Sequence, residues 1–442
     1  AFDHGLHCDD GACSILTAPI AMATKAPLPA RMSPTPPAIV LCSTLTGLAT
    51  VRALGRRGIK VIALVFDAHD PVIHSRHATR VVSAGNAEDE PTILRLIQQL
   101  ARESGERPVV MPTSDKHALL LAEHADALRA DCRLWTTAYE DLSGLVCKNA
   151  LYRLAQSADV PIVPYVADAT IAQIEQWSAD HPGPYLLKPI FDSAKVCHLR
   201  EKNHVVPTRA ELLDYLQIHG TDALVIQRVI KGGDGEIYDT YGLCDASGTP
   251  LAMASHRRLR QNRPNFGTTC FGRIPSGLGR EADARMFELT ERLLSATRFH
   301  GIFGIEWLRD RSTGNFYLID FNARPFLSIG HLVDCGMNLP YLAYLDLIGA
   351  ELPAADARPP LRALDWIDLL RDAQAKLAHD ATNPQPFWPW MLDIVRAGSS
   401  AYWDWTDPIP GLARARDIAS MALRVTFRSA KTRLHIHAAG QR

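Results

Sequence analysis

The sequence predicts an α/β region followed by an α+β region. In the first region, apolar segments at 39–42 and 61–66 are joined by an amphipathic stretch of helical length, the pattern of a parallel βαβ unit. From about residue 185 the apolar segments become shorter and alternate with turn sequences, which is typical of antiparallel sheet. One predicted hairpin, at 301–325, carries polar residues that could act together. A chain of 442 residues is long enough for two or three domains.

Changes in composition divide the chain into four segments. Residues 1–36 end in a Pro- and Ala-rich stretch, and we expect them to be a disordered leader and linker. Residues 37–145 make up the α/β region, and residues 146–350 make up the α+β region. Residues 351–442 form an extension that is first rich in Trp and then basic.

The extension is expected to pack on other parts of the protein. Aromatic residues at this density seldom stay exposed on a monomer, so we expect those of the extension to lie against the core or a second subunit. They are Phe387, Trp388, Trp390, Tyr402, Trp403 and Trp405. Residues 411–442 combine Arg residues with apolar residues at helical spacing. This segment is interpreted as a surface helix, a helix that docks on a partner, or a helix in peripheral contact with an anionic membrane.

The overall composition is that of a soluble globular protein. Apolar residues make up 47%, charged residues make up 21%, and the formal net charge of −1 gives no reason to expect nucleic acid as a partner. The nine cysteines include no C-x-x-C pair, so we expect free thiols in a reducing, cytoplasmic compartment. The histidines show no zinc-binding pattern, and the first βα turn lacks the glycine pattern of a dinucleotide site.

The predicted hairpin at 301–325 carries three oxygen-bearing side chains on one face. If the hairpin is centred on Thr313, Glu306 lies directly opposite Asp320, and strand alternation places Asn322 on the same face as Asp320. Hard oxygen ligands of this kind suit Mg²⁺, or Mn²⁺ in its place. The alternative is an ordinary surface hairpin with polar residues on its outer face.

Two other features of the hairpin follow from the same alternation. Arg324 has the parity of Asp320 and could hold a phosphate. Ile305, Ile319 and Phe321 have the opposite parity, so we expect all three to face a core.

Two lysines are candidates for binding phosphate. Lys188 lies within the apolar strand Tyr185–Pro189, where burying an ammonium is costly unless an anion accompanies it. Lys148 begins an amphipathic helix and is the weaker candidate. The alternative for Lys188 is a lysine at a strand end that reaches solvent.

The segment 227–236 is a strand followed by a flexible turn. Backbone groups near Arg228, Val229 and Ile230 could pair with an adenine ring, with Gln227 beside them. An acid just beyond, Asp234 or Glu236, could hold ribose hydroxyls, although the segment also fits a plain hairpin turn. A second cationic segment, 256–261, directly follows a strand and includes Arg257 and Arg260. It indicates an anionic ligand or, alternatively, a solvated loop.

In this order the motifs resemble the ATP-grasp superfamily from about Ala38 to Ala350. The resemblance is strongest to the stand-alone carboxylate–amine ligases of the D-aspartate ligase and carbamoyl-phosphate-synthase-like group. R-x-L-R-Q at 257–261, P-x-F-G at 264–267 and acid-x-Asn-x-Arg at 320–324 carry it. It implies an N-terminal pre-ATP-grasp domain, an ATP-grasp nucleotide-binding domain and an additional C-terminal extension.

The resemblance also implies a role for each candidate residue. Lys148 and Lys188 would contact ATP phosphates, and Gln227 to Ile230 would bind the base, with Asp234 or Glu236 at the ribose. Glu306, Asp320 and Asn322 would hold Mg²⁺. Arg324, Arg257 and Arg260 would stabilise the transferred phosphoryl group and an acyl phosphate.

The sequence departs from the superfamily pattern at two positions. The loop over the phosphates, 190–195, contains no glycine, so Ser193 or Lys195 would have to substitute for free backbone amides. The metal position that is often Glu is Asp320, which is shorter by one methylene group.

The expected reaction is ATP-dependent formation of an amide or peptide bond from a small-molecule carboxylate and an amine. The carboxylate would be activated as an acyl phosphate, with release of ADP and phosphate. The alternatives are a carboxylase or carbamoylating enzyme that uses bicarbonate, and an ATP-binding regulatory protein without turnover. We expect a monomer or homodimer, with an ATP site that does not depend on residues 411–442.

Overall fold

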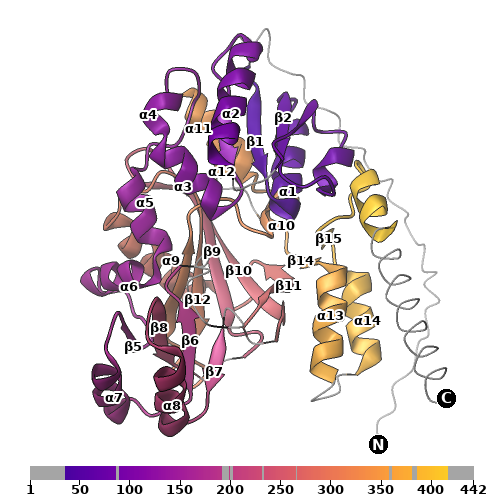
Figure 1. Ribbon diagram of the computed structural model, residues 1–442. Helices are drawn as coiled ribbons and strands as arrows, with labels where there is room; N and C mark the ends of the chain where they lie inside the picture. Colours follow the sequence, from indigo (N-terminus) through magenta and orange to yellow (C-terminus); the bar gives the residue numbers. More distant parts are fainter. Residues whose placement is uncertain are drawn as a thin grey trace, which may run out of the picture. The chain divides into compact units, whose positions relative to one another are not determined.

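The computed structural model describes residues 35–85, 89–191, 199, 203–230, 233–264, 266–357, 361–380 and 386–416. The predicted leader lies almost entirely outside these residues, as do Ser193, Lys195 and most of the basic segment 411–442. The described residues form three β-sheets with helices around them (Figure 1).

The first sheet is parallel and has four strands in the order β3-β2-β1-β4. Its strands are β1 (Ala38–Cys42), β2 (Val61–Val65), β3 (Arg80–Ser83) and β4 (Val109–Pro112). Its connections and flanking helices are α1 (Thr44–Gly55), η1 (Pro71–His74), α2 (Glu90–Ser104), α3 (Asp115–Glu123) and α4 (Ala125–Leu128). The predicted parallel βαβ unit is confirmed, and the carboxyl ends of β1 and β4 meet at one edge, as parallel strands require.

The second sheet is small and antiparallel, with four strands in the order β5-β8-β6-β7. Its strands are β5 (Tyr165–Ala167), β6 (Tyr185–Pro189), β7 (His204–Val206) and β8 (Leu224–Arg228). Its helices are α7 (Ile171–Asp180) and α8 (Arg209–His219), and α5 (Tyr139–Val146) and α6 (Lys148–Ser157) precede it in the chain. Because side chains alternate along β6, Tyr185 and Leu187 enter the core beside α7 and α8, whereas Leu186 and Lys188 face a cavity.

The third sheet has seven strands in the order β13-β12-β9-β10-β11-β14-β15. They are β9 (Ile237–Cys244), β10 (Pro250–Asn262), β11 (Thr268–Ile274), β12 (Gly301–Arg309), β13 (Phe316–Asn322), β14 (Leu364–Ile367) and β15 (Ser399–Ser400). The associated helices are α9 (Arg280–Ser295), α10 (Ile329–Asp334), α11 (Leu339–Ile348), α12 (Ala354–Ala357), α13 (Leu369–Asp380) and α14 (Phe387–Arg396). Together the sheets confirm the predicted combination of an α/β region and an α+β region.

The β12–β13 hairpin has the predicted register at its functional end. Glu306 pairs with Asp320 and Gly304 pairs with Asn322. A bulge between Glu306 and Trp307 shifts the register nearer the turn, and with it the orientation of Ile319. The prediction that Ile319 faces the core is therefore wrong: Leu318 is buried in the core, and Ile319 is half-buried and lines the cavity.

The extension continues the large sheet instead of standing apart from it. Strand β14 pairs with β11, and α13 packs on β10 and β11, with α14 beside α13 in Figure 1. Arg52 of α1 and Asp407 of the extension form a buried ion pair of 2.9 Å. The described extension is therefore bound to both the large sheet and α1.

The aromatic residues of the extension divide into two groups. Trp390 donates a hydrogen bond to Asp372, and Tyr402 packs against the core around α1. Phe387, Trp388, Trp403 and Trp405 are exposed, Trp388 to 75% and Trp405 to 84%. The prediction of packing on the core is thus wrong for these four residues. Their contact with a second subunit stays a prediction.

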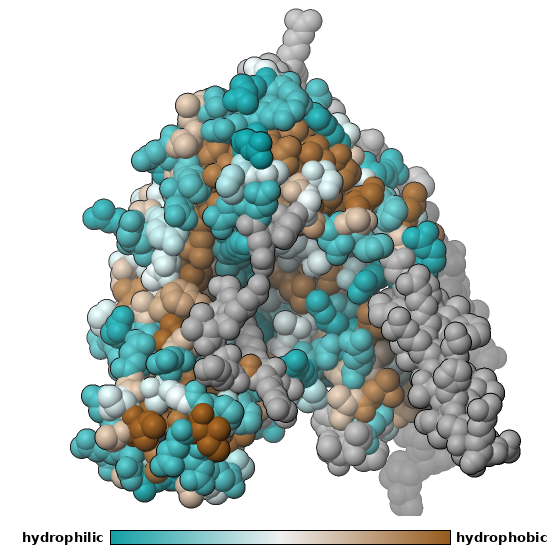
Figure 2. Space-filling model, viewed as in Figure 1, coloured by the Kyte–Doolittle hydropathy of each residue, from teal (hydrophilic) through white to brown (hydrophobic). Residues whose placement is uncertain are grey.

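Hydrophilic residues predominate on the face shown in Figure 2, and hydrophobic residues form separate patches among them. Among the described residues, no helix is both long enough and apolar enough to cross a bilayer.

Candidate functional site

A cavity of about 750 Å³ lies between the small antiparallel sheet and the large sheet. Strands β6 and β8 line one side of it, and β9, β10, β12 and β13 line the other. On the second side, side chains that are paired across β9 and β12 form rows. Successive rows are two residues apart along each strand, a step of roughly 7 Å. Along β9 the rows carry Ile237, then Asp239, then Tyr241, so the character of the cavity changes from apolar to acidic to aromatic.

The apolar end is bounded by both sheets. Ile237 pairs with Leu308 on the large sheet, and Leu186 faces them from β6. Gln227 of β8 also lines this end and is almost completely buried, yet its Nε2 has no hydrogen-bond acceptor among the described residues. A flat ligand with hydrogen-bond acceptors would fit between the apolar walls and satisfy this amide.

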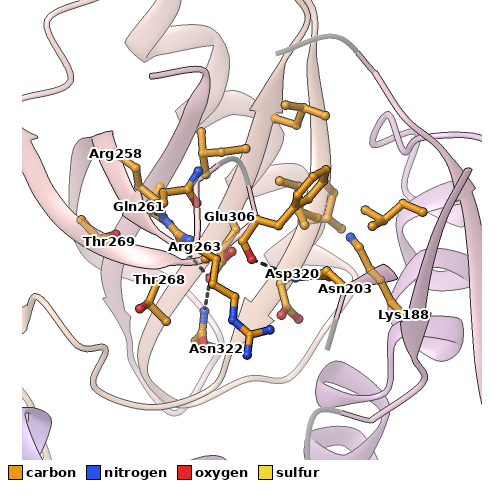
Figure 3. A pocket seen from close by; sticks show the side chains of 18 of the residues that line it. Lys188, Asn203, Arg258, Gln261, Arg263, Thr268, Thr269, Glu306, Asp320 and Asn322 are labelled. Atoms are coloured by element: carbon orange, nitrogen blue, oxygen red, sulfur yellow. Dashed lines mark hydrogen bonds and ion pairs between the residues drawn. The ribbon is translucent and has the colours of Figure 1, made fainter. Parts of the chain in front are cut away.

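The acidic row brings the three predicted oxygen ligands together (Figure 3). Asn322 Nδ2 donates to Glu306 Oε1 at 3.1 Å, and Asp320 lies opposite Glu306 in the register. Each carboxylate faces a cation: Arg258 is 2.6 Å from Glu306, and Lys148 Nζ is 3.7 Å from Asp320 Oδ2. The row is thus a compact alternation of positive and negative side chains.

This donor set fits a hard divalent cation. Two carboxylates and an amide oxygen project from the facing strands β12 and β13 into one cavity, and oxygen donors are what Mg²⁺ and Mn²⁺ prefer. In the described part of the chain, no cluster of three or more His, Cys, Asp or Glu residues suits a metal ion. The assignment of Glu306, Asp320 and Asn322 as metal ligands stays a prediction.

Both predicted lysines lie at the cavity and are buried. Lys188 enters from β6, on the side of Asp320 away from Arg258 (Figure 3). Lys148 is the first residue of α6, and its backbone amide donates to the carbonyl of Ile190 at 3.0 Å. The start of α6 is thereby fixed to the end of β6.

The cationic residue that β10 presents to the cavity is Arg258. The predicted residues Arg257 and Arg260 do not line it. A register shift on either side of Arg260 breaks the alternation of β10, so that Arg258 and Gln261 face the cavity while Arg260 faces the extension. Arg257 turns to the opposite side, where its Nε donates to the carbonyl of Gly235 and its guanidinium lies over the Tyr238 ring.

Arg258 is held at the cavity by a buried carboxylate. Its Nε and NH2 donate to the two oxygens of Asp239, at 3.1 Å and 2.6 Å. Burial alone would raise the pKa of Asp239, but the charge of Arg258 and the hydrogen bond from His256 outweigh it and lower that pKa to about 2. Burial alone would lower the pKa of Arg258, and the charges of Asp239 and Glu306 outweigh it and raise that pKa.

The backbone segment predicted to pair with adenine, residues 228–230 (here called the hinge), lies at the cavity, but part of its backbone already forms hydrogen bonds. The amides of Arg228 and Val229 donate to the carbonyls of Pro164 and Pro184. Ile230 lines the cavity with them, and no described residue accepts a hydrogen bond from its amide. The hinge amide that remains for a ligand is therefore that of Ile230.

Asp234 and Glu236, the two acidic residues predicted to hold ribose hydroxyls, lie outside the cavity lining. Glu236 is buried and forms ion pairs with Arg309 and Arg311. Asp234 accepts a hydrogen bond of 3.0 Å from Gln261, which itself lines the cavity. Glu236 therefore stabilises the turns around β12, and only Asp234 is connected to the site.

At the aromatic end of the cavity, the large sheet is connected to the start of α3, beside the parallel sheet. Tyr241 and Phe326 are stacked with ring centroids 3.4 Å apart, and glycine at 304 leaves room for both rings, since a Cβ there would lie 3.2 Å from Phe326. Arg324 donates to Asn322 Oδ1 at 3.0 Å and to Asp115 Oδ2 at 2.9 Å. Asp115 is the first residue of α3, so Arg324 connects the acidic row to the edge of the parallel sheet.

Sequence reasoning missed Asp239 and included Arg258 only as a member of the cationic segment 256–261, although the sequence holds a signal for both. All eight residues of β9 are buried, and Asp239 carries a charge in that strand. A buried acid needs a cationic partner, and the neighbouring strand supplies Arg258. Asn203 and Arg263 also line the cavity and were missed because they lie in loops without a regular pattern.

Known proteins provide fold-level comparisons. No family model matches the sequence, and no curated protein matches it. The structure is similar to biotin carboxylase of Campylobacter jejuni in complex with β,γ-ATP, with a TM-score of 0.59 and 16% identity over 74% of both chains. It is also similar to N5-carboxyaminoimidazole synthetase of Staphylococcus aureus, with a TM-score of 0.60 and 14% identity over 79% of this chain and 86% of that one.

A third similar structure is an L-amino acid ligase of Bacillus licheniformis, with a TM-score of 0.57 and 17% identity. The match covers 75% of this chain and 79% of that chain. These structures are ATP-grasp enzymes, and the matches extend over most of each chain. The arrangement of sheets around the cavity, together with these matches, shows that the protein has the ATP-grasp fold.

Proposed function

We propose that this protein is an ATP-dependent carboxylate–amine ligase that forms an amide or peptide bond through an acyl phosphate. The observation that carries the proposal is one cavity that holds an apolar end, an acidic row, a pair of lysines and a pair of arginines. The lysines are Lys148 and Lys188, and the arginines are Arg258 and Arg324. The similarity to an L-amino acid ligase supports it at the level of fold. The sequence motifs of the carboxylate–amine ligases point to the same reaction.

In this proposal the adenine ring of ATP occupies the apolar end. Ile237 and Leu308 would cover one face of the ring, and Leu186 would cover the other. Gln227 Nε2 would donate to a ring nitrogen, which satisfies an otherwise unpaired buried amide. The amide of Ile230 would provide a second hydrogen bond to the base.

The phosphates would extend toward the acidic row. Lys188 and Lys148 approach that row from the small sheet and α6, and their ammonium groups would neutralise phosphate oxygens. Glu306, Asp320 and Asn322 would hold the divalent cation, which when bound withdraws charge from the phosphate oxygens. Arg258 lies next to this row on the side opposite Lys188, and Arg324 donates a hydrogen bond to Asn322.

The acid substrate would then bind beside Arg258 and Arg324. One of its carboxylate oxygens attacks the γ-phosphorus, the bond from that phosphorus to the β,γ-bridging oxygen breaks, and ADP leaves. The two guanidinium groups would stabilise the negative charge that the transferred phosphoryl group carries. We assign this role to Arg258 instead of Arg257 and Arg260, because Arg258 is the one of these three residues that lines the cavity.

The amine would complete the reaction. Its nitrogen attacks the acyl carbon, the bond from that carbon to the phosphate oxygen breaks, and phosphate leaves while the nitrogen loses a proton. The acyl phosphate forms on the substrate itself, so the reaction requires no covalent intermediate with a side chain of the protein. Positioning and charge neutralisation therefore account for the chemistry.

A carboxylase that uses bicarbonate is a second candidate, because two of the similar structures are a biotin carboxylase and an N5-carboxyaminoimidazole synthetase. Bicarbonate could use the same two guanidinium groups. The ligase would need an acid and an amine for release of ADP, whereas the carboxylase would need bicarbonate.

The test is ADP release from the purified protein with Mg²⁺ and ATP, measured against a panel of amino acids and other small carboxylates paired with amines. We expect ADP release to depend on one acid–amine pair and to yield a product in which the two masses combine with loss of water. ADP release that needs bicarbonate instead supports the carboxylase. Nucleotide binding without ADP release under any of these conditions rejects both enzymes and favours a regulatory protein.

A further inference from the structure

Asp239 is a charged residue with an unusual concentration of partners. It lies in the middle of β9, and its side chain is 1% exposed. Besides the two bonds from Arg258, its Oδ2 accepts from His256 Nδ1 at 2.7 Å and from the Tyr241 hydroxyl at 3.3 Å. Four donor atoms from three side chains thus converge on one carboxylate.

These contacts fix the carboxylate in one orientation. Tyr241 contacts Ser328 at 2.9 Å as well as Asp239, so the loop after β13 is connected to the carboxylate. His256 is fully buried on the neighbouring strand, directly opposite Asp239 in the register. His256 lies on β10, and Tyr241 is itself bound to Ser328 in the loop after β13, so Asp239 cannot rotate without breaking several bonds.

The carboxylate in turn fixes the guanidinium of Arg258. A carboxylate that binds Nε and NH2 together holds the planar guanidinium in a defined plane. Glu306 also engages NH2. No described residue binds NH1, and Arg258 lines the cavity, so NH1 is the nitrogen left for a ligand.

We propose that Asp239 is a positioning residue that holds Arg258 so that its NH1 binds the carboxylate of the acid substrate. The inference rests on the proposed ligase function and deepens it, because it assigns one guanidinium nitrogen to one substrate group. Asp239 itself touches neither substrate nor nucleotide in this assignment. Its effect on the reaction passes through the orientation of Arg258.

A purely structural role for Asp239 makes a different prediction, and the chain contains a matched control. Asp407 is also 1% exposed and also pairs with a buried arginine, Arg52, at 2.9 Å. Asp407 further accepts a hydrogen bond from Ser75 and lies outside the cavity lining. Asp239→Asn and Asp407→Asn therefore remove the same charge from similar surroundings, and only one of these positions is connected to the cavity.

The first experiment compares these variants by steady-state kinetics and by calorimetry with a non-hydrolysable ATP analogue. For Asp239→Asn we expect kcat/KM for the acid to fall about 100-fold, because a guanidinium of Arg258 that is no longer held in one plane misplaces the substrate. The Kd of the nucleotide should stay within about twofold, since Arg258 lies away from the proposed base site. Asp407→Asn should lower the melting temperature and leave the KM of the acid unchanged.

A second experiment does not require Asp239→Asn to fold. Arg258→Ala should be partly rescued by methylguanidinium, which the intact Asp239 can bind through two nitrogens. Methylammonium at the same concentration should rescue less, because a point charge cannot form the paired bonds.

Three results would overturn the inference. Acid kinetics of Asp239→Asn that match those of Asp407→Asn would show that the role is only structural. Equal rescue of Arg258→Ala by the two cations, or rescue by neither, would show that paired binding by Asp239 does not matter. Failure of the wild-type protein to release ADP with any acid would reject the ligase function, and the acid-binding role of Asp239 with it.

Discussion

Arg258 and Arg260 are two residues apart on β10, and each forms paired hydrogen bonds with a buried aspartate. Arg258 pairs with Asp239 on the cavity side, and Arg260 pairs with Asp372 on the side of the extension, through Nε at 2.7 Å and NH2 at 3.0 Å. The two arginines differ in the contacts of the remaining guanidinium nitrogen, NH1. NH1 of Arg260 donates to Asp393 at 2.6 Å, whereas no described residue binds NH1 of Arg258.

The difference shows how one strand can serve two purposes. A guanidinium whose nitrogens are all bound to protein carboxylates acts as an anchor, here for α13 and α14. A guanidinium with one nitrogen left over can bind a ligand while the other two keep it in place. The bulge in β10 assigns these roles, since it turns Arg260 away from the cavity.

The largest expected effect comes from exchanging the two arginines for alanine. Arg258→Ala should lower kcat by about 100- to 1000-fold, the range for removing one preorganised donor. Arg260→Ala should leave kcat within a few fold and destabilise the protein by about 3 kcal/mol, because the buried Asp372 carboxylate loses its cationic partner. Kinetics and urea unfolding of both variants measure this contrast, and a similar loss of kcat in both would refute it.

The next contrast concerns the second carboxylate beside each arginine, Glu306 beside Arg258 and Asp393 beside Arg260. Glu306→Gln should reduce turnover by about 100-fold and raise the Mg²⁺ concentration needed for half-maximal rate, because it removes a proposed metal ligand. Asp393→Asn, which is partly exposed, should change neither quantity by more than about twofold. Turnover that persists in excess EDTA would contradict the metal assignment for Glu306.

Acid should weaken the cavity-side pair in a defined range of pH. The pKa of Asp239 is lowered to about 2, so its stabilising contribution is fully present above its unfolded pKa near 4 and is lost as the pH falls through about 2. A shift of roughly two pKa units corresponds to about 2–3 kcal/mol. The difference in unfolding free energy between the wild type and Asp239→Asn should shrink by about that amount from pH 5 to pH 2; a constant difference would contradict the assignment.

A smaller effect is expected on the opposite side of the cavity. Lys188→Ala should weaken binding of ATP about 10-fold through loss of a phosphate contact, and should affect AMP much less. Calorimetry with both nucleotides measures the contrast. Equal affinity of the variant and the wild type for ATP would remove Lys188 from the proposed site.

The smallest effect is expected from shortening the extension. Deletion of residues 411–442 should leave the affinity for ATP unchanged, because the anchoring contacts of Arg260 lie in α13 and α14, before the deletion. A loss of affinity would connect this segment to the site. Sedimentation of the full-length and shortened proteins with anionic vesicles tests the predicted peripheral membrane contact, which is dropped if neither protein sediments.

Local sequence patterns determined most of what surrounds the proposed metal site. Alternation and the turn around Thr313 were sufficient to place Glu306 opposite Asp320, because both lie on one hairpin whose register depends on its turn. The βαβ unit and the lysine of β6 follow from similarly local rules. The assignment of metal and nucleotide contacts to these residues stays a prediction.

Only the tertiary structure decided which arginine of β10 faces the cavity. A bulge changes the parity of every residue after it, and the sequence of 256–261 does not show where the bulge lies. Asp239 is 19 residues away from Arg258 in the sequence, and Asp372 is 112 residues away from Arg260, and contacts over such separations leave no local pattern. The sequence by itself thus determined the fold class and the facing carboxylates, because short-range geometry sets both. The tertiary structure decided the division of β10 into a ligand-facing arginine and an anchoring one, because that division depends on long-range pairing of buried charges.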